Sequence, residues 1–107
     1  MQRVTLVRYT AKPDRASENE ALSLAVFAEL RRVMPEHVAY ALFRDGNEFV
    51  HLFVNTKDDD SASVTELPSF KAYTEGILAR CEAPPEQTRL RLNLLDSYGL
   101  TPVAVPA

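Results

Sequence analysis

Three polar side chains could take part in catalysis or in substrate binding: His51, Arg91 and Asn55. All three lie in segments typical of β-strands. An imidazole titrates near neutral pH, so His51 could act as a general base toward a phenolic proton. Arg91 could hold a carboxylate, a phenolate or a reduced oxygen species, and Asn55 could orient a substrate. Each has a structural alternative, since His51 could be hydrogen-bonded within an interface and Arg91 could form an ion pair with a partner subunit.

A hairpin is predicted around Gly46-Asn47, because a glycine-containing pair between two alternating segments favours a two-residue turn. The turn pairs Asp45 with Glu48 and fixes which residues share a face. Apart from Asp45 and Glu48, the residues on their face of the hairpin are all apolar: Ala39, Ala41, Phe43, Val50, Leu52 and Val54. We call this face the alanine face. The opposite face, here called the histidine face, carries Val38, Tyr40, Leu42, Arg44, Phe49, His51, Phe53 and Asn55.

The order of segments predicts a ferredoxin-like α+β fold, βαββαβ, with an antiparallel four-stranded sheet. The expected elements are strands at Arg3–Thr10, His37–Arg44, Glu48–Asn55 and Thr88–Ser97, and helices at Ser17–Met34 and Pro68–Cys81. Ser17 and Glu20 match a capping box at the start of the first helix. With 107 residues the chain is expected to form one domain, with a core at 3–98 and an extended tail at 99–107.

Composition narrows the classes of partner. A net charge of −3 gives no reason to expect a nucleic acid or an anionic membrane. A single cysteine, Cys81, excludes an internal disulfide and fits a reducing cytoplasm. The three aspartates at 58–60 lack the spacing of a calcium loop, and His37 and His51 have no acidic neighbours at ligand spacing. We therefore expect no metal and no other cofactor.

The two helices are expected to cover the alanine face, which would leave the histidine face in water. A patch of this size normally marks an interface or a ligand site. We therefore expect a homodimer that packs the two histidine faces together around a cavity for a small aromatic ligand. The expected lining is Tyr9, Tyr40, Leu42, Phe49 and Phe53, with His51, Asn55 and Arg91 as its polar groups.

Three strings give the chain a resemblance to the antibiotic biosynthesis monooxygenases of the dimeric α/β-barrel superfamily. They are Lys12-Pro13-Asp14 after the first strand, Phe49-Val50-His51-Leu52 in the third strand, and Leu67-Pro68-Ser69-Phe70-Lys71-Ala72-Tyr73 at the start of the second helix. The resemblance covers most of residues 3–98. It implies a dimeric α/β barrel and a cofactor-free monooxygenase that oxidises a quinol or a phenolic aromatic, with Asn55, Arg91 and Tyr40 as candidates for the substrate-activating groups.

A haem-degrading branch of the same superfamily uses an asparagine, a tryptophan and a histidine, and the resemblance does not extend to these. Val7 occupies the asparagine position, Thr74 lies at about the histidine position, and the chain contains no tryptophan. Two alternatives to a monooxygenase stay open. One is a non-catalytic homodimer that binds a small ligand or serves as a scaffold, and the other is an isomerase or lyase, because one fold hosts many chemistries.

Overall fold

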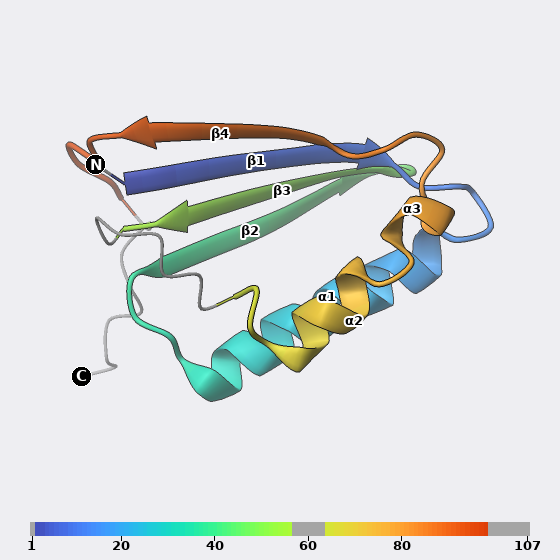
Figure 1. The fold of residues 1–107 in the computed structure, drawn as a ribbon, viewed down its shortest axis with the longest axis horizontal. Coiled ribbons are helices and arrows are strands. Elements are labelled where there is room, and N and C mark those ends of the chain that lie inside the picture. Colours follow the sequence, from blue (N-terminus) through green and yellow to red (C-terminus); the bar gives the residue numbers. More distant parts are fainter. Residues whose placement is uncertain (1, 57–63, 99–107) are drawn as a thin grey trace.

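The computed structural model describes residues 2–56 and 64–98, and Figure 1 shows a sheet with all of its helices on one side. The strands are β1 (Gln2–Thr10), β2 (Val38–Asp45), β3 (Glu48–Asn55) and β4 (Glu86–Leu92). The helices are α1 (Ala16–Val33), α2 (Pro68–Thr74) and α3 (Ile77–Arg80). The strands pair antiparallel in the order β2-β3-β1-β4. This is the predicted ferredoxin-like α+β fold.

The hairpin between β2 and β3 has the predicted register. Asp45 pairs with Glu48, and the next pairs follow without a bulge as far as Val38 with Asn55. Gly46 has φ of 60°, while Asn47 is not among the residues with positive φ. Glycine at the first turn position is typical of a type II′ turn, whose twist matches that of the flanking strands.

The start of α1 differs from the prediction. The helix begins at Ala16, its N-cap is Arg15, and no side chain caps it, so Ser17 and Glu20 do not form a capping box. Arg15 instead donates to the carboxylate of Glu18 within the first turn. The helix ends at Val33, one residue before the predicted end, and its C-cap Met34 adopts the left-handed conformation with φ of 52°.

The second helical segment is divided, although the sequence predicted one helix over 68–81. Glu75 is extended and Gly76 has φ of 77°, so α2 stops and α3 starts one turn later. Glycine adopts this conformation without the steric cost of a Cβ atom. The last strand also differs, since β4 begins at Glu86 and ends at Leu92, which pairs with Gln2 at the start of β1. β4 therefore ends where its partner strand runs out.

The assignment of the two sheet faces was wrong. Tyr73 of α2 and Asn19 of α1 contact residues of the histidine face, and Phe49 and His51 on that face are 0% and 3% exposed. The alanine face is the uncovered one, with Phe43 58% exposed. The reason is size, because Tyr40, Phe49, His51 and Phe53 fill the space beneath the helices that alanines would leave empty.

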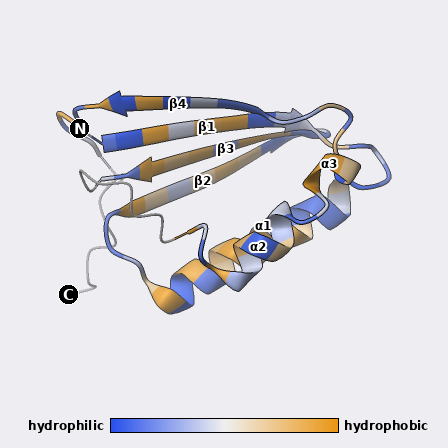
Figure 2. Ribbon diagram, in the orientation of Figure 1, coloured by the Kyte–Doolittle hydropathy of each residue, from blue (hydrophilic) through white to orange (hydrophobic). Residues whose placement is uncertain are grey.

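The two faces continue across β1 and β4. By register, Arg3, Thr5, Val7 and Tyr9 share the histidine face, and Val4 and Leu6 share the alanine face with Leu90 of β4. Figure 2 shows hydrophilic and hydrophobic residues alternating along β4. The aspartates at 58–60 and the tail at 99–107 lie outside the described residues. No helix in the described part of the chain is long and apolar enough to cross a bilayer.

Candidate functional site

His51 lies near the middle of β3, between Val7 of β1 and Leu42 of β2, and faces the helices. Its side chain is held at both ring nitrogens by tyrosine hydroxyls. Nδ1 is 2.7 Å from the hydroxyl of Tyr40, and Nε2 is 2.7 Å from the hydroxyl of Tyr9 and 3.1 Å from that of Tyr73. A histidine buried among three phenols is therefore the centre of the site.

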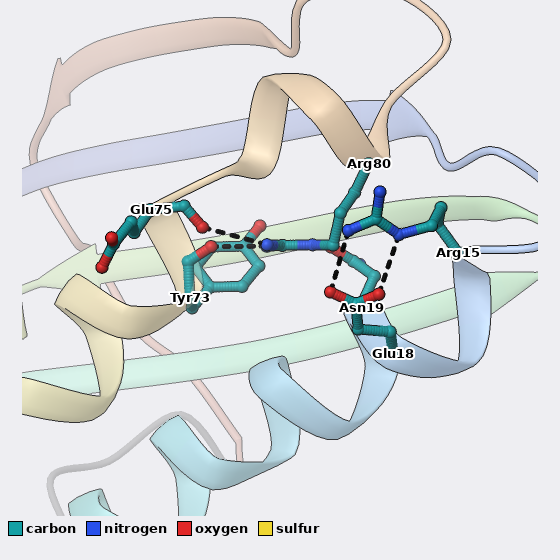
Figure 3. Close-up of polar contacts among 6 residues, drawn as sticks. All are labelled: Arg15, Glu18, Asn19, Tyr73, Glu75 and Arg80. Atoms are coloured by element: carbon teal, nitrogen blue, oxygen red, sulfur yellow. Dashed lines mark hydrogen bonds and ion pairs between the residues drawn. The ribbon is translucent and has the colours of Figure 1, made fainter.

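The hydrogen-bonded chain continues into the helices. The amide of Asn19 donates to the hydroxyl of Tyr9 at 2.9 Å, and that hydroxyl is 2.7 Å from the hydroxyl of Tyr73. Arg80 donates through Nε to Oδ1 of Asn19 at 3.1 Å and through its terminal nitrogens to the carbonyls of Tyr73 and Glu75 (Figure 3). Asn19 is 0% and Arg80 2% exposed. The network therefore connects three strands, β1, β2 and β3, with the helices α1, α2 and α3.

The hydrogens of this network can be arranged in two ways. With the ring proton on Nδ1, His51 donates to Tyr40 and accepts from Tyr9, while Asn19 and Tyr73 both donate to the oxygen of Tyr9. The hydroxyl hydrogen of Tyr40 is then free for a ligand. With the ring proton on Nε2, Tyr40 donates to Nδ1 and its oxygen can accept from a ligand. Tyr40 can thus act as donor or acceptor according to the tautomer of His51, as proton transfer in both directions requires.

Burial governs the charge states at this site. It lowers the pKa of His51 to about 4, because the imidazolium would lose its hydration. It also raises the pKa of Tyr9, Tyr40 and Tyr73, since a tyrosinate would lose hydration in the same way. Near neutral pH the imidazole and the three phenols are therefore all uncharged, and the imidazole is in the form that can accept a proton.

A pocket of about 320 Å³ opens beside the network, at the edge of the space between sheet and helices. Tyr40 and His51 contribute to its wall, together with apolar side chains from the sheet and α2 and with polar groups from β1 and β4. The full lining is Arg3, Thr5, Val7, Tyr40, His51, Phe53, Val64, Thr65, Phe70, Gln87 and Arg89. A small concave site with mixed apolar and polar walls is typical of small-molecule binding.

All eight candidate residues lie on the histidine face, but they divide by position. His51, Tyr40 and Phe53 line the pocket, and Tyr9 lies behind His51 in the network. Asn55 is 2% exposed at the end of β3, and Phe49 is 0% exposed with its ring stacked on that of Tyr9. Leu42 pairs with His51 across the hairpin, and Arg91 pairs with Arg3 on exposed β4. None of these last four is among the lining residues.

Asn19 and Arg80 were missed by the sequence reading, and Tyr73 was interpreted as a core residue. Tyr73 is in the core, 6% exposed, but its hydroxyl also belongs to the network. Asn19 carried a signal, because it lies on the same helical stripe as Ser23 and Val26, where a polar residue needs a buried partner. Arg80 carried none, since a basic residue in the last turn of a helix is usually solvated.

The described residues contain no cluster of three or more histidine, cysteine or carboxylate side chains that could hold a metal ion. The basic and aromatic groups of the pocket suit an organic ligand.

Comparison with solved structures identifies the fold. A protein from Caulobacter crescentus, named as a candidate antibiotic biosynthesis monooxygenase, superposes with a TM-score of 0.72 at 18% identity, covering 87% of this chain and 91% of that one. Rv0793 from Mycobacterium tuberculosis gives 0.71 at 19% identity, covering 90% of this chain and 100% of that one. SnoaB from Streptomyces nogalater, a cofactor-independent oxygenase, gives 0.62 at 21% identity over 89% and 98%.

The fold is therefore that of the antibiotic biosynthesis monooxygenase structures, in agreement with the resemblance in the sequence. No family model and no curated protein matches the sequence.

Proposed function

We propose that this protein is a cofactor-independent monooxygenase that oxidises a small phenolic or quinol-type substrate in the pocket between sheet and helices. The observation that carries the proposal is the contact between Tyr40 and His51 at the wall of that pocket. A substrate hydroxyl next to Tyr40 would have access to a buried neutral base through one intervening hydroxyl. The shared fold with an oxygenase that needs no cofactor adds support.

Proton removal is the step that the site would catalyse. The substrate hydroxyl gives its proton to the oxygen of Tyr40, while Tyr40 passes its own proton to Nδ1 of His51. The imidazolium that forms is costly in an apolar site, but the phenolate formed beside it supplies the compensating charge. Because both nitrogens of His51 are occupied by tyrosines, Tyr40 is the group that touches the substrate, and His51 acts through it.

The reaction balances without an external reductant: a phenol and O₂ give a quinone and water. The phenolate transfers one electron to O₂, and the resulting phenoxyl radical and superoxide combine at a ring carbon to form a peroxide. The imidazolium returns its proton through Tyr40 to the peroxide. Loss of the ring C–H proton then breaks the O–O bond, and the departing hydroxide takes that proton to become water. All four electrons that reduce O₂ come from the substrate.

Tyr40→Phe tests this role. Removing the hydroxyl breaks the path from substrate to His51, so oxygen uptake with a panel of quinols and naphthols should fall about 10²–10⁴-fold. The stability loss should be only about 1 kcal/mol. Tyr73→Phe is the matched control, because it also removes one hydroxyl from the network but Tyr73 does not line the pocket. Its rate should stay within a few-fold of the wild type. Full activity of Tyr40→Phe would exclude the proposed path.

The second candidate is a non-catalytic protein that binds a small aromatic ligand. It is favoured by one observation, the occupation of both His51 nitrogens by tyrosines, which is also how a purely structural histidine is satisfied. Binding of phenols to the wild type without any oxygen uptake across the panel would select this candidate.

We also infer a homodimer, formed through the alanine face. This face carries apolar side chains from all four strands, with Phe43, Leu90 and Leu92 at 58%, 48% and 47% exposure. Its charged residues Arg8, Asp45, Glu48 and Glu86 lie together at one end. Two such faces packed together would give the dimeric α/β barrel expected from the resemblance, with each pocket outside the interface. The buried thiol of Cys81 is compatible with a cytoplasmic location.

A further inference from the structure

The pocket beside Tyr40 has charged side chains in its wall that take no part in the proposed proton path. Its lining includes two arginines, Arg3 and Arg89, and none of its described residues is acidic. His51 is uncharged near neutral pH, so arginines are the only charged side chains among the described lining residues, in a protein whose net charge is −3. The side chain of Arg89 donates a hydrogen bond to the neutral amide oxygen of Gln87 at 3.3 Å. Its guanidinium is therefore available to an anion.

The sheet register places this charge at the far end of the pocket from Tyr40. Tyr40 pairs with Phe53, Phe53 with Thr5, and Thr5 with Arg89, so these four residues form one row across the histidine face. Neighbouring strands are about 4.8 Å apart, which puts the Cα atoms of Tyr40 and Arg89 about 14 Å apart. β2 and β4 are the two edges of the sheet (Figure 1). The row therefore begins at Tyr40, the proposed proton acceptor, passes the aromatic ring of Phe53, and ends at the cationic side chain of Arg89.

A second pocket of the protein has a lining of the opposite charge. It lies at the opposite end of β1 and is lined by Arg8, Tyr9, Thr10, Glu48, Glu82, Ala83, Pro84 and Glu86. Its single arginine, Arg8, is paired with Glu48 at 2.8 Å, and two further carboxylates leave the lining negative. An anionic ligand would be repelled there and attracted at the pocket beside Tyr40.

We propose that the substrate is a phenol fused to or bearing an aromatic system whose far end carries a carboxylate, and that Arg89 binds this carboxylate. The proposal rests on the proposed function for the placement of the hydroxyl at Tyr40. The planar fork of a guanidinium matches a carboxylate. The aromatic body would lie along Phe53 and Phe70.

The test compares two probes, a hydroxynaphthoic acid with its hydroxyl and carboxyl groups at opposite ends of the ring system, and its methyl ester. Binding is measured by calorimetry under nitrogen, so that no turnover is needed. The wild type should bind the acid about tenfold more tightly than the ester, as one exposed charge-assisted contact allows. Arg89→Gln should remove this preference while leaving the affinity for the ester within about twofold.

Arg8→Gln is the matched control, because it removes an arginine from the same sheet at the other pocket, and the preference for the acid should persist. Equal affinity of the wild type for acid and ester, no binding of either, or an unchanged preference in Arg89→Gln would each overturn the assignment. This test does not depend on oxygenase activity. If the protein consumed no oxygen but still preferred the acid in a way that required Arg89, the carboxylate site would be supported and the oxygenase proposal would not.

Discussion

At the scale of single residues, His51 is a buried imidazole whose Nδ1 contacts Tyr40, a tyrosine that lines the pocket. A histidine with free nitrogens in the pocket would act on a substrate directly. Here Tyr40 occupies Nδ1, and Tyr9 and Tyr73 share Nε2. Both ring nitrogens are therefore occupied by hydroxyl groups from two other strands and one helix, and of these three tyrosines only Tyr40 lines the pocket beside them.

The depressed pKa of His51 predicts how stability depends on pH. The pKa of His51 is about 4 in the folded protein, against an ordinary value of 6.5. Between these two values the unfolded chain binds a proton at His51, whereas the folded protein does not. The contribution of neutral His51 is thus fully present above pH 6.5 and is lost as the pH falls toward 4. The free energy of unfolding should drop by about 2 kcal/mol between neutral pH and about pH 5.

Urea denaturation at several pH values measures this drop. His51→Gln keeps a polar side chain but has no titratable ring, so most of the pH dependence in this range should disappear in the variant. His37→Gln is the control, because it removes the other histidine and leaves the buried one. If His51→Gln retained the full slope, the loss would have to come from other groups.

At the scale of elements, Arg80 of α3 joins α1 to the end of α2. Its guanidinium donates to Asn19 of α1 and to the carbonyls of Tyr73 and Glu75, where α2 ends (Figure 3). None of these acceptors is charged. The break between α2 and α3 at Gly76 turns the chain so that Arg80 can reach back over the end of α2. Arg80 therefore holds in place the two helical residues, Asn19 and Tyr73, whose side chains hydrogen-bond to Tyr9.

Arg80→Lys should lower the free energy of unfolding by about 2–3 kcal/mol. An ammonium keeps the charge but cannot serve three separated acceptors in the geometry of a guanidinium, and buried acceptors would be left unpaired. Arg15→Lys is the matched control, because Arg15 pairs with Glu18 on the exposed surface of α1, and it should change stability by no more than about 0.5 kcal/mol. Equal losses in denaturant unfolding of the two variants would contradict the bridging role of Arg80.

At the scale of the whole molecule, the sheet has one covered and one open face. Phe43→Asp should therefore convert the proposed dimer of the 12.0-kDa chain into monomers at micromolar concentration, because each subunit would bury an unpaired charge in an apolar interface. Phe43 is 58% exposed, so the fold of the monomer should survive. Leu78→Asp, on α3 and 65% exposed, is the control that should stay dimeric in light scattering. A monomeric wild type would exclude the dimer.

The sequence alone determined the order of elements, the hairpin register and the sharing of one face by His51, Tyr40 and Phe53, because turn chemistry and the two-residue period of strands are local properties. It did not determine which face the helices cover. Both faces are rich in apolar residues, and the choice depends on how well bulky rings fill the gap beneath α1 and α2. The partners of His51 were also out of reach, since Tyr9, Tyr40 and Tyr73 come from three elements and meet only after packing. Tertiary structure therefore decided that the helices cover the histidine face and leave the alanine face open.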